Sequence, residues 1–82
     1  MAKREKLLER LKGKPTNFTW DELVAVMEGL GYELKKTGGS GRKFIHKESR
    51  VAAFLHEPHP GKFLKAYLIR DILAHLKQEK KI

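Results

Sequence analysis

Hydrophobic positions along the chain change from a helical spacing to a strand spacing and back again. Near the N-terminus, Leu7, Leu8 and Leu11 share one helical face before a Gly-Lys-Pro sequence, which predicts a short helix over residues 3–12. Near the C-terminus a second amphipathic pattern predicts a helix over residues 64–78. Its apolar stripe consists of Leu68, Ile69, Ile72, Leu73 and Leu76.

A further helix is predicted between these two. Thr19 is expected to cap its N-terminus, and Glu22, three residues later, completes a capping box. The helix should end at about Leu30, because Gly31 stands where a left-handed residue commonly terminates a helix. Its apolar face consists of Trp20, Leu23, Val24, Met27 and Leu30.

From Tyr32 the apolar residues alternate with polar ones, which indicates β-strands. We expect three antiparallel strands: one from Tyr32, one over residues 42–47 after a glycine-rich turn, and one over residues 50–55 after a turn at 47–49. Consecutive apolar residues in the last two strands leave the face of several side chains open. The inward residues are expected to be Tyr32, Leu34, Phe44 and residues of the 51–55 segment.

The order helix, helix, three strands, helix favours an α+β fold in two layers, with helices covering a three-stranded antiparallel sheet. Eighty-two residues are enough for a single small domain with one core. No apolar run approaches the roughly 20 residues that cross a bilayer, and no secretory signal is present, so we expect a soluble cytoplasmic protein without membrane contact. The absence of cysteine excludes disulfides, thiolate metal sites and a cysteine nucleophile.

The chain has a net charge of +8, and its charged residues are distributed unevenly along the sequence. The predicted helix after Thr19 is acidic, whereas the predicted strand region is basic, which favours a polyanion such as RNA as the partner of that region. Two basic clusters flank the glycine-rich turn, whose backbone can approach phosphates closely. The candidate RNA-binding residues are Lys35, Lys36, Ser40, Arg42, Lys43 and Arg50.

Several short motifs together resemble the HicA toxin family. They are Trp20-Asp21-Glu22-Leu23, Leu30-Gly31-Tyr32, Gly39-Ser40, Phe44, Pro58-His59-Pro60-Gly61-Lys62 and Ile69-Arg70-Asp71-Ile72-Leu73. The resemblance implies a double-stranded-RNA-binding-domain-like core over residues 18–78, with residues 1–17 as an N-terminal helical extension. It also implies a toxin that cleaves mRNA without a metal or cofactor and is neutralised by a HicB antitoxin.

The same resemblance places the family's catalytic histidine at Gly41, which has no side chain to accept a proton. Of the remaining histidines, His46 and His56 are the candidate catalytic bases, because an imidazole titrates near neutral pH. His59, between two prolines, is expected to hold its loop, and His75 is expected to be solvated.

A metal site is not expected at residues 56–59, because proline prevents the helix that HExxH ligands need. Two hypotheses therefore remain open. One is a metal-independent endoribonuclease toxin. The other is a non-catalytic RNA- or protein-binding module of HicA-like fold, which the glycine at position 41 favours.

Overall fold

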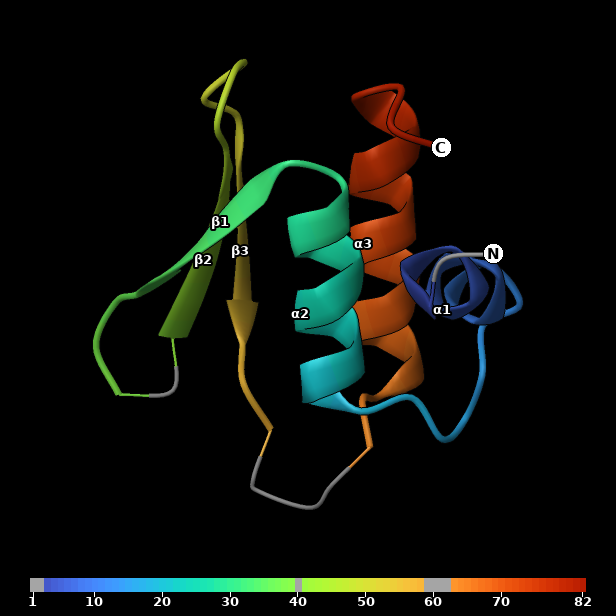
Figure 1. The fold of residues 1–82 in the computed structure, drawn as a ribbon. Coiled ribbons are helices and arrows are strands. Elements are labelled where there is room, and N and C mark those ends of the chain that lie inside the picture. Colours follow the sequence, from blue (N-terminus) through green and yellow to red (C-terminus); the bar gives the residue numbers. More distant parts are fainter. Residues whose placement is uncertain (1–2, 40, 59–62) are drawn as a thin grey trace.

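The computed structural model describes residues 3–39, 41–58 and 63–82, and it contains three helices and three strands. Figure 1 shows them in chain order: α1 (Lys3–Lys12), α2 (Trp20–Gly29), β1 (Tyr32–Lys36), β2 (Gly41–His46), β3 (Ala52–His56) and α3 (Ala66–Gln78). The fold is α+β, and it has the layers expected of a double-stranded-RNA-binding-domain-like core with an additional N-terminal helix. No helix in the described ranges has the length and apolar character needed to cross a bilayer.

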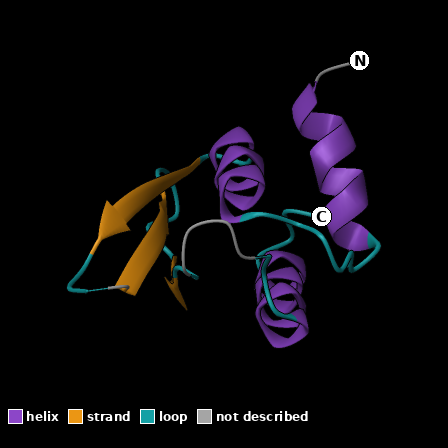
Figure 2. Ribbon diagram, turned by 90° about the horizontal axis from the view of Figure 1, so that it is seen from below, coloured by secondary structure: helices purple, strands orange, loops and turns teal. Residues whose placement is uncertain are grey.

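The three strands form one antiparallel sheet in the order β1-β2-β3. Figure 2 shows all three helices on one side of it, with α1 beyond α2 and α3. The opposite side of the sheet is therefore uncovered by any described element, and we call it the outer sheet face.

The start of α2 follows the capping box predicted from the sequence. The backbone N–H of Glu22 donates to the Thr19 hydroxyl over 3.2 Å, and the Glu22 carboxylate accepts from the Thr19 N–H over 3.0 Å. At the other end, Leu30 is the C-cap and Gly31 has a φ of +93°, as a left-handed terminating residue requires. These two ends set the direction in which the chain enters β1.

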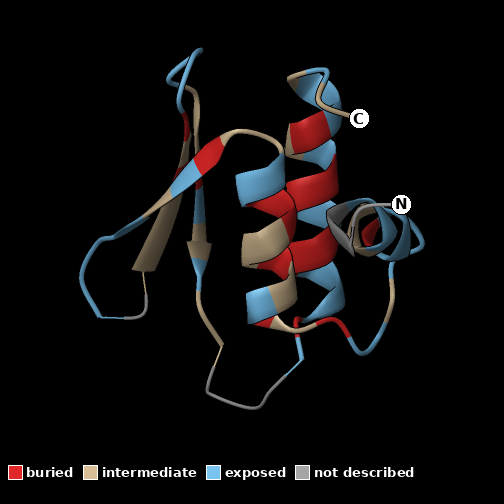
Figure 3. Ribbon diagram, viewed as in Figure 1, coloured by how far each residue is buried: buried red, intermediate tan, exposed pale blue. Residues whose placement is uncertain are grey.

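The core lies between the sheet and the helices, where Figure 3 shows the buried segments facing one another. Trp20 of α2 packs on Phe44 of β2 with ring centroids 5.7 Å apart, which joins the two layers. Tyr32 is buried as predicted, and Leu34 is partly buried against the same core. The predicted stripe of α3 is confirmed, since all its members are buried: Leu68, Ile69, Ile72, Leu73 and Leu76.

Several predicted boundaries differ from the structure. Helix α3 begins at Ala66 rather than residue 64, because Leu64 donates its N–H to the Phe18 carbonyl in an extended bridge. The turn between β2 and β3 is longer than predicted, because Arg50 has a φ of +64° and donates its N–H to the carbonyl of His46. As a result β2 ends at His46 and β3 begins at Ala52.

Helix α1 packs against the core through three leucines and one arginine. Leu11 is fully buried, and Leu7 and Leu8 pack against the same core. The Arg10 guanidinium pairs with Glu22 and lies 5.3 Å from the Phe18 ring centroid. The leucine stripe of α1 is thus used within this chain.

Truncation of Leu11 should destabilise the protein. Leu11→Ala leaves a cavity between α1 and the rest of the core, and we expect a loss of about 2–5 kcal/mol in the free energy of unfolding. Urea denaturation monitored by circular dichroism measures it. Lys12→Ala, at the exposed neighbouring position, is the control and should change stability by less than about 0.5 kcal/mol. Equal stability of the two variants would contradict the docking of α1.

Candidate functional site

The outer sheet face combines positive charge, an exposed aromatic ring and a histidine. Side chains alternate along each strand, and Phe44 and Ala53 are buried toward the helices, so their neighbours point outward. The outward side chains are Glu33 and Lys35 on β1, Lys43 and Ile45 on β2, and Phe54 and His56 on β3. The sequence alone had left these faces open.

Phe54 is the most exposed large hydrophobic residue described, at 70% of its accessible surface. In the sheet register it is paired with Lys43, and the Lys43 ammonium lies 5.6 Å from the ring centroid, a cation–π arrangement. The next pair in the same direction joins Lys43 to Lys35. An aromatic ring and two lysines thus form one continuous row across the three strands.

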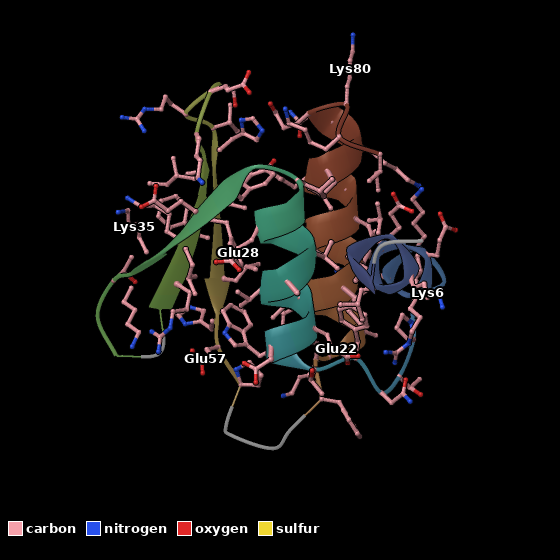
Figure 4. The ribbon with its side chains drawn as sticks, viewed as in Figure 1. Lys6, Glu22, Glu28, Lys35, Glu57 and Lys80 are labelled. Carbon is pink, nitrogen blue, oxygen red and sulfur yellow. The ribbon has the colours of Figure 1, made fainter. Side chains whose placement is uncertain are left out.

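The electrostatic field around this row is positive. The Glu33 carboxylate lies 2.7 Å from the Lys35 ammonium, which lowers the pKa of Glu33 by hydrogen bonding and by charge. Lys47 and Arg50, in the turn after β2, lower the pKa of Glu33 further. The only acidic side chain described on β1 is therefore surrounded by cations, and Figure 4 shows Lys35 projecting away from the helices.

The glycine-rich turn places Gly41 next to β3. Gly41 donates its N–H to the Gly38 carbonyl over 2.9 Å and accepts from the Thr37 N–H over 3.1 Å. A Cβ at position 41 would collide with the Thr37 hydroxyl, so any side chain there requires Thr37 to move. Gly41 pairs with His56 across the sheet. Ser40, a candidate RNA-binding residue, lies outside the described residues.

Arg42 holds the two loops at this end of the sheet together. Its Nε donates to Glu57 over 2.8 Å, and its Nη1 donates to the carbonyls of Gly39 and Gly41 over 3.0 and 2.7 Å. Three of its donor contacts are therefore made within the chain, and the negative charge beside it is that of Glu57. Among the predicted phosphate-binding residues, Lys36 and Arg50 are exposed instead.

His46 is buried at 6% exposure, and both of its ring nitrogens have partners. Nδ1 accepts from the backbone N–H groups of Glu48 and Ser49 over 3.2 and 3.3 Å. Because Nδ1 is then unprotonated, Nε2 carries the hydrogen and donates to the Leu30 carbonyl over 3.2 Å. Gly31 allows this approach, since a Cβ there would lie 3.0 Å from Nε2. The imidazole joins the β2–β3 turn to the end of α2.

His56 has a different environment, because it is exposed at the end of β3 on the outer sheet face. The two histidines do not come together: the partner of His46 across the β2–β3 turn is Val51, whose carbonyl accepts the His46 N–H over 2.9 Å. In the sheet His46 is therefore nearer to Val51 than to His56.

His75 was expected to be solvated, and this expectation is wrong. Its Nε2 lies 2.9 Å from the Tyr32 hydroxyl. Partial burial lowers the pKa of His75, while the Glu79 carboxylate opposes the change. Burial also raises the pKa of Tyr32. His59 lies outside the described residues, and within the described ranges no three His, Asp or Glu side chains gather as metal ligands.

Comparison with known proteins identifies the family. A family model described as the HicA toxin of bacterial toxin–antitoxin systems matches residues 20–78. The chain belongs to the HicA toxin family. No curated protein and no solved structure matches it. The family match includes the outer sheet face and excludes α1.

Sequence reasoning missed three features of this candidate site. It gave Phe54 no role, because the run Ala-Ala-Phe-Leu does not alternate between apolar and polar residues. The pattern therefore does not show which face of the sheet Phe54 occupies. It also missed the pairing of Arg42 with Glu57, since Arg42 lies in β2 and Glu57 follows β3, 15 residues later. The position of His56 opposite Gly41 needed the register of β2 with β3, which depends on the length of the intervening turn.

Replacement of His46 should reduce stability. His46→Ala leaves the Leu30 carbonyl and the Glu48 and Ser49 amides without their imidazole partner, and we expect a loss of roughly 2–4 kcal/mol in the free energy of unfolding. Thermal denaturation measures it, with the exposed His56→Ala as the control. A His46→Ala protein as stable as the control would contradict the structural role.

Stability should also depend on His75 below neutral pH. The pKa of His75 is lowered from 6.5 in the folded protein, so the unfolded chain binds more protons as the pH falls through about 6.5. The folded state is therefore stabilised above that pH and loses this contribution below it. Urea denaturation at pH 7.5 and 5.5 should show a smaller pH effect for His75→Gln than for the wild type. An equal effect in both proteins would exclude His75 as the source.

Proposed function

We propose that this HicA-family protein is a metal-independent endoribonuclease that cleaves mRNA in the cytoplasm and is neutralised by a HicB-type antitoxin. The observation that carries the proposal is the pairing of Gly41 with His56. Directly paired residues on antiparallel strands project to the same face with side chains about 4.5–5.5 Å apart. His56 therefore brings an imidazole to the neighbourhood of the position that holds the family's histidine.

His56 is the better candidate for the general base. The RNA must be able to reach the base, and His46 is buried with its Nδ1 accepting two backbone N–H groups. His56 is exposed on the outer sheet face, where RNA can reach it. We assign His46 to positioning the β2–β3 turn and His56 to proton transfer.

In the proposed reaction the neutral imidazole of His56 removes the proton of a ribose 2′-hydroxyl. The 2′-oxygen attacks the adjacent phosphorus, the bond from phosphorus to the 5′-oxygen breaks, and a 2′,3′-cyclic phosphate forms. The departing 5′-oxygen takes up a proton from water or from the imidazolium. The charge on the phosphate oxygens is stabilised by nearby cations, for which Lys43 on the same face is well placed.

RNA binding is proposed for the basic surface of the sheet. Lys35, Lys36, Lys43 and Arg50 supply phosphate contacts, whereas Arg42 supports the turn through Glu57. Ser40 stays a candidate by its place in the turn. Because phosphate contacts release condensed counterions, the affinity for RNA should fall steeply as salt rises.

A second candidate function is a non-catalytic RNA- or protein-binding module of HicA fold. Gly41 favours it, because the family's histidine is absent from its usual place. The same basic outer sheet face would then hold RNA or an acidic antitoxin without cutting.

The His56→Ala variant separates the two functions. We expect wild-type protein to cleave RNA in the presence of chelator and His56→Ala to lose roughly 10²- to 10⁴-fold in the single-turnover rate, because a general base contributes that much. Gel analysis of end-labelled RNA measures the rate, and His46→Gln, tested below its melting temperature, is the matched histidine control.

A restored histidine gives the complementary test. Thr37→Ala with Gly41→His removes the hydroxyl that would collide with a side chain at position 41, and in the His56→Ala background it should recover cleavage. Absence of cleavage by wild-type protein, together with harmless expression in cells, would establish the non-catalytic module instead. Growth arrest relieved by a co-expressed HicB-type protein would support the toxin.

A further inference from the structure

Phe54 has an environment that is unusual for a large apolar side chain. It is 70% exposed although it stands in the middle of a strand, while the core on the other side of the sheet is closed without it. On the same face its neighbours along β3 are Ala52 and His56, and those on β2 are Gly41, Lys43 and the partly buried Ile45. The ring is therefore accessible over much of its surface, and the core does not account for its position.

The charge around the ring selects the class of ligand. Residues 32–56 contain six lysines or arginines, of which Lys35 and Lys43 lie on the outer sheet face. By contrast, α2, on the opposite side of the sheet, contains three acidic residues and no basic one. One of those lysines, Lys43, lies against the Phe54 ring, and Lys35 is next in the same row. A ligand that meets this surface needs negative charge for the lysines and a flat face for the ring.

We infer that the outer sheet face binds unpaired, single-stranded RNA by stacking one base on Phe54, with Lys43 and Lys35 contacting the adjacent phosphates. A nucleotide supplies both required groups, and base stacking on an aromatic ring tolerates any base. In a duplex each base is already stacked on its neighbours and its faces are inaccessible, so the platform selects single strands. This inference rests on the proposed RNA-directed function and names its substrate class.

The platform also fits the position proposed for cleavage. Phe54 and His56 are two residues apart on β3 and point to the same face, which places them about 6.5 Å apart along the strand. This is close to the spacing of one nucleotide along an extended strand. A nucleobase stacked on Phe54 thus brings the ribose of the same or the next nucleotide close to His56.

Binding to an RNA that cannot be cut tests the inference. The probe is a 2′-O-methyl RNA of about eight nucleotides, used single-stranded and annealed to its complement, and fluorescence anisotropy at low salt gives the affinity. We expect wild-type protein to prefer the single strand, and both Phe54→Ala and Phe54→Leu to weaken that binding roughly 5- to 100-fold. Phe54→Trp should bind at least as tightly as wild type.

Tyr67→Ala is the matched control, because Tyr67 is 54% exposed on α3, on the helical side of the molecule. Affinity of Phe54→Ala within twofold of wild type, full binding by Phe54→Leu, equal loss in Tyr67→Ala, or preference for the duplex would each overturn the inference. So would a loss confined to binding of a HicB-type protein, which would make the face a protein interface.

The probe separates the inference from the proposed function. Because it has no free 2′-hydroxyl, its binding does not depend on cleavage. Phe54-dependent binding by a protein that does not cut RNA supports the platform and rejects the ribonuclease. Cleavage that requires His56 but is unchanged in Phe54→Ala rejects the platform alone. Absence of binding to either form of RNA rejects both.

Discussion

Phe44 packs against Trp20 from the middle of β2, and this contact fixes which side of the central strand faces the helices. Side chains alternate along a strand, so a slip of one residue would exchange the two faces of the sheet. Phe44 pairs with Leu34 on β1 and with Ala53 on β3, so these two residues also face the helices. The inward and outward faces of β1 and β3 are fixed in this way. Lys43, Phe54 and the histidine at the end of β3 therefore reach the outer sheet face as a set. The candidate site is a consequence of core packing.

Helix α2 is acidic, in contrast to the basic sheet. Helix α2 combines an acidic first turn with the capping box, and its Glu22 also receives Arg10 from α1. Burial alone would raise the pKa of Glu22, but hydrogen bonds from Thr19 and Arg10 lower it, so the carboxylate stays charged where the positive end of α2 stabilises it. The additional helix α1 thus supports the acidic start of α2 through Arg10, while Lys35 and Lys43 lie on the outer sheet face.

Local signals in the sequence were sufficient for most of the fold. A capping box, a glycine at a helix end and a stripe with helical period each describe contacts within a few residues, and all three agree with the structure. The site depended on contacts between distant residues. The turn after β2 extends to Arg50 because that residue adopts a left-handed conformation. A glycine at this position would have signalled that conformation in the sequence, but an arginine does not. The length of the turn sets the register that opposes Gly41 to His56.

The two histidines of the sheet illustrate how position decides chemistry. His46 occupies an inward position, where burial excludes water and backbone amides hold Nδ1, so its imidazole acts as a rigid link between the turn and α2. His56 occupies an outward position opposite a residue without a side chain. Two residues that pair across neighbouring strands point to the same face of the sheet and are close neighbours. An imidazole at either residue of such a pair would therefore occupy nearly the same place. The imidazole of His56 therefore lies close to the place that a side chain at position 41 would occupy, as long as the register of β2 with β3 is kept.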